Sequence, residues 1–133
     1  MRVLLQCAGF VLMVAISAGC GGTATQLGYT PKSKDRMDEV GAMYKSYMAA
    51  NKGNLPKKLS DLDPFEPANQ YGFAAIRDGE VVMFWGGAKS GDSGSIIQAH
   101  DKSISSTGGF VLMQDGTVKE MSASEFGSAK KAK

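Results

Sequence analysis

Few residues of this chain could carry acid–base or nucleophilic chemistry. His100 is the single histidine among 133 residues, and it stands beside Asp101 near the end of an expected strand. An imidazole next to a carboxylate can act as a general base, but neighbouring strand residues point to opposite faces of a sheet. No serine stands in the Gly-x-Ser-x-Gly setting of a hydrolase nucleophile. The sequence therefore predicts no catalytic residue and a protein that is not an enzyme.

Metal chemistry has equally little support. A transition metal needs several histidine or cysteine ligands, and the chain has one histidine and two cysteines, Cys7 and Cys20. Calcium needs only oxygen ligands, for which Asp92 and Asp101, with nearby Ser93 and backbone carbonyls, are weak candidates. These residues lack the spacing of a calcium loop, and aspartate and serine are common in turns. We expect no metal and no other cofactor, with a calcium site as the alternative.

Charge limits the partners. The chain has 15 basic and 13 acidic residues, a formal net charge of +2, which argues against a nucleic-acid partner. Lys130, Lys131 and Lys133 gather near the end, where they could contact anionic lipid or phosphate. The simpler expectation for residues 128–133 is a solvated, frayed basic tail.

The first nineteen residues have the layout of an export signal. Arg2 supplies a positive charge, residues 3–16 form an apolar run broken only by Gln6 and Gly9, and small residues follow. A membrane span needs about 20 apolar residues, so the run is short for a permanent helix. Residues 1–19 are therefore expected to be removed as a signal peptide.

The run Ser17-Ala18-Gly19-Cys20 resembles the lipobox of bacterial lipoproteins, although Ser17 stands where leucine is usual. In that family the chain is cut before the cysteine, which then carries diacylglycerol on sulfur and a further acyl chain such as palmitate. The resemblance implies cleavage between Gly19 and Cys20 and lipid attachment at Cys20. It also implies a place on the cell membrane or outer membrane, facing the periplasm or exterior. More than one acyl chain is needed for stable anchoring. An ordinary secretory signal with an incidental cysteine is the alternative.

Residues 20–33 are expected to form the lipidated cysteine and a flexible tether, because glycine, threonine, glutamine and proline dominate and no apolar period appears. One domain should follow over residues 34–127. It begins with an amphipathic helix from Ser33, as N-cap, to about Lys52, which Gly53 ends. The apolar residues at helical spacing are Met37, Val40, Tyr44, Tyr47 and Met48.

The second half has the pattern of an antiparallel sheet. Strands are expected over 81–85 and 95–99, and residues 109–113 and 117–121 should pair as a hairpin about Asp115-Gly116. A two-residue type I′ turn there would place Met113 beside Val118 and Phe110 beside Met121. Between helix and sheet, residues 59–67 suggest one helical turn or an extended connector. The run Ser122-Ala123-Ser124-Glu125 predicts a capping box that opens a short helix through Phe126. The fold class is therefore α+β, with the long helix packed on a small antiparallel sheet of three to four strands.

Three segments in this order resemble pseudopilin-like, prepilin-type domains, which are expanded in planctomycete-type bacteria: residues 43–47, residues 53–59 and residues 109–118. The resemblance covers about Asp35 to Phe126 and implies a pilin-head-like fold, in which some members bind calcium in the sheet region. Prepilins carry a glutamate inside a long apolar helix that continues into the domain, and this chain has no acidic residue in its apolar segment. The assembly helix is therefore missing, and no catalytic residue is transferred.

Together these features predict a membrane-anchored envelope lipoprotein that acts as a non-catalytic structural or interaction module and is a monomer. Its expected partners are membrane lipid, through Cys20, and envelope or secretion-system proteins. An accessory component of a type II secretion or pilus-like system is the alternative. A calcium- or glycan-binding surface module is the third reading.

Overall fold

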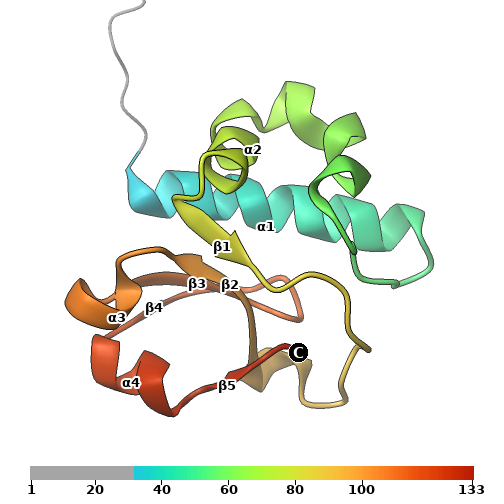
Figure 1. Ribbon diagram of the computed structural model, residues 1–133. Helices are drawn as coiled ribbons and strands as arrows, with labels where there is room; N and C mark the ends of the chain where they lie inside the picture. Colours follow the sequence, from blue (N-terminus) through green and yellow to red (C-terminus); the bar gives the residue numbers. More distant parts are fainter. Residues whose placement is uncertain (1–31) are drawn as a thin grey trace, which may run out of the picture.

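Helix α1 (Ser33–Ala50) opens the part of the chain that the computed structural model describes, residues 32–133 (Figure 1). The predicted signal peptide, Cys20 and most of the predicted tether lie outside these residues. The buried side chains of α1 form one stripe of Met37, Val40, Met43, Tyr44 and Met48.

The two ends of α1 follow different local rules. Lys32 rather than the expected Ser33 is the N-cap, and its N–H donates to the Asp35 carboxylate at 3.1 Å. Ser33 lies inside the first turn, which leaves its hydroxyl for another partner. At the other end, Lys52 and Gly53 both adopt left-handed backbone, with φ of 55° and 82°. The Gly53 N–H donates back to the Met48 carbonyl at 2.7 Å, so Gly53 ends the helix as predicted.

A short helical layer follows, in which the helical turn offered for residues 59–67 is present and a further helix was not predicted. It consists of η1 (Leu59–Asp61), η2 (Asp63–Ala68) and α2 (Gln70–Arg77), and α2 packs on α1. A Cβ on Gly72 would lie 2.8 Å from the Val40 nitrogen, so only glycine permits this close approach. The Gly72 N–H also donates to the Glu39 carboxylate at 2.8 Å.

The sheet confirms the α+β class. Strands β1 (Val81–Met83), β2 (Ile96–Asp101), β3 (Gly109–Met113) and β4 (Val118–Met121) pair antiparallel in this order. A fifth strand, β5 (Lys130–Lys131), pairs parallel with Ile96 and Ile97 of β2. The sheet thus has five strands rather than three to four.

Strand β5 also corrects the expectation of a frayed basic tail over 128–133. The Ala132 N–H donates to the Ile97 carbonyl at 2.9 Å, which extends the pairing beyond β5 itself. The Lys131 ammonium lies 4.4 Å from the centre of the Phe126 ring and donates to the Phe126 carbonyl at 2.8 Å. A cation over an aromatic ring is a favourable contact, so the tail is part of the domain.

The β3–β4 hairpin differs from its prediction by one residue. Leu112 pairs with Val118, and Phe110 with Glu120, instead of the expected Met113 with Val118 and Phe110 with Met121. The turn has three loop residues, 114–116, because the Gly116 N–H donates to the Met113 carbonyl and only Gly116 is left-handed, at φ 89°. This is a type I turn with a glycine bulge, not the expected type I′ turn.

The sheet separates two apolar layers. Its α1 face carries the main core, in which Ala99 and Leu112 meet the buried stripe of α1. Its other face carries a smaller cluster that includes Ile97, Val111 and Met113. Two short helices, α3 (Ile104–Thr107) and α4 (Ala123–Ser128), cover this second face with Ile104 and Phe126.

The predicted capping box at the start of α4 is confirmed. The Glu125 N–H donates to the Ser122 hydroxyl at 3.2 Å, and the Ser122 N–H donates to the Glu125 carboxylate at 2.7 Å. The hydrogen bonds from the Ser122 N–H and hydroxyl hold the pKa of Glu125 below its usual value.

Within residues 32–133, no helix combines the length and the apolar character that crossing a membrane requires.

Candidate functional site

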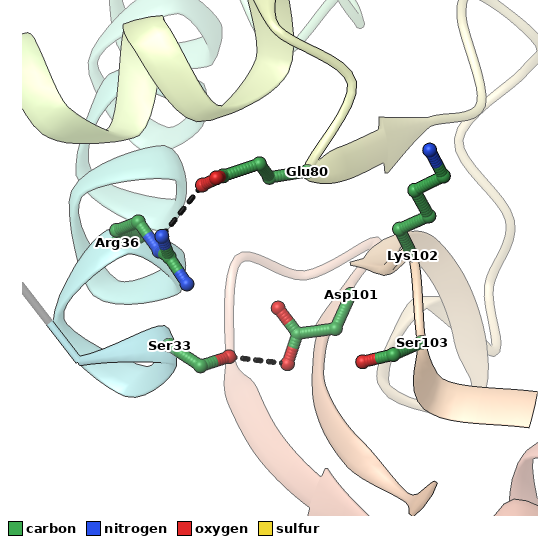
Figure 2. A pocket seen from close by; sticks show the side chains of 6 residues that line it. All are labelled: Ser33, Arg36, Glu80, Asp101, Lys102 and Ser103. Carbon is green, nitrogen blue, oxygen red and sulfur yellow. Dashed lines mark hydrogen bonds and ion pairs between the residues drawn. The ribbon is translucent and has the colours of Figure 1, made fainter. Parts of the chain in front are cut away.

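A polar hollow of about 480 Å³ lies where the start of α1 meets the end of β2, and we call it the N-terminal hollow (Figure 2). Ser33 and Arg36 come from α1, Glu80 precedes β1, and Asp101 ends β2. Lys102 and Ser103 complete its lining.

Asp101 is the central residue of the N-terminal hollow. It is only 7% exposed, and one carboxylate oxygen accepts from the Ser33 hydroxyl at 2.5 Å and from the Phe110 N–H at 2.7 Å. A Cβ on Gly109 would lie 2.7 Å from the same oxygen, so the glycine makes room for the carboxylate. Asp101 therefore connects the first turn of α1 to the start of β3.

An ion pair between Arg36 and Glu80, at 2.5 Å, closes the hollow on the side of β1. Their side chains are 26% and 55% exposed, and ion pairs this accessible contribute about 0–1 kcal/mol. The Arg36 Nε is buried without a hydrogen-bond partner among the described residues. The pair positions the loop before β1 more than it stabilises the domain.

The N-terminal hollow has little capacity for catalysis. The Ser33 hydroxyl donates to a carboxylate, which is a much weaker base than the imidazole that usually activates serine. His100 does not reach the hollow, because it lies on the opposite face of β2 from Asp101. The separation of His100 and Asp101 onto opposite faces was expected from their adjacency along a strand.

His100 instead packs against two aromatic rings, which are tilted relative to its own. Its ring centre lies 5.5 Å from that of Phe84 and 4.7 Å from that of Phe126. The Nδ1 atom lies 2.8 Å from the Asp101 carbonyl oxygen, and a carbonyl can only accept, so Nδ1 carries a proton. His100 is therefore a packed side chain with a structural hydrogen bond.

The two calcium candidates are far apart. Asp92 precedes η3 (Ser93–Ser95) and Asp101 ends β2, which spans about 17 Å at the rise of a strand. In residues 32–133 there is no group of three His, Cys, Asp or Glu side chains that could hold a metal ion. Asp92 and Asp101 therefore lie at opposite ends of β2, and neither belongs to such a group among the described residues.

Two buried glutamines form a polar network that the sequence analysis missed. The Gln98 amide donates to the Phe84 carbonyl, and the Gln114 side chain accepts from the Ser90 N–H at 2.7 Å and donates to the Ala88 carbonyl at 3.3 Å. They hold the loop between β1 and β2 against the sheet. Nothing in the local sequence marks these glutamines, because their partners lie 14 to 26 residues away.

Tyr44 is a second buried polar anchor. Its hydroxyl donates to the Gln114 carbonyl at 3.0 Å, which connects α1 to the β3–β4 turn. Burial, and to a smaller extent the charge of Asp115, raises the pKa of Tyr44 well above its usual value. The phenol therefore stays neutral and acts as a structural donor.

Neither a protein-family model, nor a curated protein, nor a solved structure matches this chain. The resemblances to lipoprotein signals and to pilin-like domains therefore remain predictions from the sequence.

Proposed function

We propose that the protein is a lipoprotein of the cell envelope, anchored through Cys20, whose domain acts as a non-catalytic structural or interaction module. The observation that carries the proposal is the apolar run of residues 3–16 followed by Ser17-Ala18-Gly19-Cys20. Diacylglycerol on Cys20 would occupy the single cysteine of the mature chain, which has no partner for a disulfide.

The domain itself is consistent with a module outside the membrane. Its large apolar side chains are mostly buried, and among the described residues only Tyr71 and Val82 are more than a third exposed. Eleven residues separate Cys20 from Lys32, and the twelve peptide units between these two positions reach about 40 Å when extended. The anchor would therefore leave the domain free to contact other envelope components.

Mass spectrometry of the mature N-terminus, with membrane fractionation, tests the anchor. We expect the mature chain to begin at Cys20 with added mass for three acyl chains, and Cys20→Ala to release the protein or leave it as an unprocessed precursor. Cys7→Ala is the matched control, because that cysteine lies in the leader and should have no effect. An unmodified Cys20, or cleavage elsewhere, would refute the proposal.

We also propose, at finer detail, that the domain is a pilin-like head. The arrangement that favours this is a long helix against the face of an antiparallel β1–β4 sheet, with an Asp-Gly turn after β3. The alternative role, an accessory of a type II secretion or pilus-like system, requires binding to pilin-like partners. A pull-down with the lipidated protein separates the two roles, because an accessory would enrich secretion-system components.

A further inference from the structure

A second hollow, of about 520 Å³, lies at the opposite end of α1 from the N-terminal hollow, and we call it the basic hollow. The 18 residues of α1 separate the two ends by about 27 Å. The hollow lies between the last turn of α1 and the segment that leads to η1. Its lining consists of Tyr47, Asn51, Asn54, Leu55, Lys57, Lys58, Asp61 and Gly87.

The polar groups of the basic hollow are largely uncommitted. Within residues 32–133, the ammonium groups of Lys57 and Lys58, the Asn54 amide and the Tyr47 hydroxyl make no hydrogen bond or ion pair. The Asp61 carboxylate, by contrast, already has partners, because it accepts from the backbone N–H groups of Lys57 and Lys58 at 2.8 and 3.2 Å. The hollow therefore presents free cations and donors to solvent.

Positive charge extends beyond the lining. Lys52 is exposed on the turn between α1 and the hollow and is held in left-handed backbone, which a lysine adopts only at a cost. Its ammonium makes no ion pair within the described residues. Three lysines thus border a hollow that contains one carboxylate, Asp61.

We infer that the basic hollow binds a segment of an acidic polysaccharide, with sugar carboxylates on the lysines. Tyr47 packs against the main core and also lines the hollow, so it offers an aromatic ring against which the apolar face of a sugar can pack. Asn54 supplies a free side-chain amide, which can both donate to and accept from sugar hydroxyls, whereas the Asn51 amide donates to the Tyr47 carbonyl at 2.9 Å and keeps its oxygen as an acceptor. The volume lies in the range of about 300–1,000 Å³ that holds small ligands.

A polysaccharide suits this surface better than a lipid bilayer does. The surface is concave and combines amides with an aromatic ring, whereas a bilayer contacts protruding basic and apolar side chains. The hollow also lies at the end of α1 away from the residue where the predicted tether joins. With a lipid on Cys20, the domain would connect the membrane to an acidic glycan, but the hollow would bind its ligand without the lipid as well.

Binding of alginate hexamer, a uronic-acid oligomer, to the full-length protein in detergent tests the inference. Calorimetry should give binding at least tenfold tighter for alginate than for a neutral glucose hexamer, and Lys57→Gln/Lys58→Gln should weaken alginate binding at least tenfold. The matched control is Lys34→Gln/Lys102→Gln, which removes the same charge near the start of α1 and should change affinity less than twofold.

Lys52→Gly separates binding from folding. It removes one ammonium but also relieves the left-handed backbone, so alginate binding should weaken about threefold while the thermal midpoint does not fall. Equal losses in both double variants would show general charge attraction and overturn the inference. The absence of alginate binding by the wild type would also overturn it. So would a wild type that binds phosphatidylglycerol vesicles instead of alginate, if Lys57→Gln/Lys58→Gln abolished that vesicle binding.

Discussion

At the scale of single residues, Asp101 holds the start of α1 to β3, and its removal should be costly. Asp101→Ala leaves the part-buried Phe110 N–H and the Ser33 hydroxyl without their acceptor. Unpaired buried donors of this kind cost about 1–3 kcal/mol, so we expect a loss of about 2 kcal/mol in the free energy of unfolding. Urea unfolding followed by circular dichroism measures this loss.

Two variants make the Asp101 measurement specific. Asp101→Asn keeps an oxygen that can accept from the Phe110 N–H, and should lose clearly less stability than Asp101→Ala. Asp92→Ala removes an exposed carboxylate, and its midpoint should match the wild type. If Asp101→Ala were as stable as Asp92→Ala, the contact between α1 and β3 would have to be assigned to other residues.

The sequence identified Asp101 but could not identify its role. A carboxylate beside a histidine suggests catalysis or metal binding, and the separation of His100 and Asp101 onto opposite faces followed correctly from the strand period. The partners of Asp101 did not follow, because Ser33 lies 68 residues away along the chain. Pairing of this kind depends on the register of β2 and β3, which includes an irregularity between Ile97 and Ala99.

At the scale of elements, the β3–β4 turn depends on Gly116. Its φ of 89° is unfavourable for a β-branched residue, and an added Cβ would lie 2.6 Å from the Cγ of Lys45 on α1. Gly116→Val should therefore lower the free energy of unfolding by more than about 1 kcal/mol. The comparison is with Gly91→Val, since Gly91 has open space around it and no left-handed backbone. Equal denaturation midpoints for the two variants would contradict this account of the turn.

The elements show where sequence patterns suffice. The helix from Ser33, the Asp-Gly hairpin and the Ser122 capping box each have a local signal, and each appears in the structure at or near its predicted place. The register of the hairpin differs because Asp-Gly fits two kinds of turn. A two-residue type I′ turn was predicted, and the structure has a three-residue turn. The Asp115 carboxylate accepts from the Thr117 N–H at 2.9 Å, and this bond lowers the pKa of Asp115.

Helix α2 and strand β5 were not predicted. Helix α2 has eight residues, contains Gly72 and is held by its contact with α1. Strand β5 has two residues and forms only because β1 leaves part of the β2 edge unpaired. Tertiary packing decides β5, which neither periodicity nor capping residues could have indicated. The buried residues of α2 do recur at helical spacing, with Phe73 and Ile76 three apart, so periodicity could have indicated this helix despite Gly72.

At the scale of the whole molecule, the two hollows lie at opposite ends of α1 and differ in the state of their charges. In the N-terminal hollow, Arg36 pairs with Glu80 and Asp101 is satisfied by neutral donors. In the basic hollow, Lys57 and Lys58 remain unpaired within the described residues. The first arrangement holds elements together, whereas the second leaves charge available for a partner.

The burial of the apolar stripe of α1 predicts that the piece from Thr30 to Lys133 is a folded monomer that does not form filaments. Pilin-type assembly uses an apolar helix face that packs on neighbouring subunits, but the apolar stripe of α1 is already covered, with Met37, Val40 and Met43 fully buried in the domain's own core. The stripe is wide enough for one sheet face and leaves no apolar face for a neighbour. Sedimentation over a concentration series should give a constant monomer mass. Regular polymers in electron micrographs would instead place an assembly surface on the polar faces of the domain.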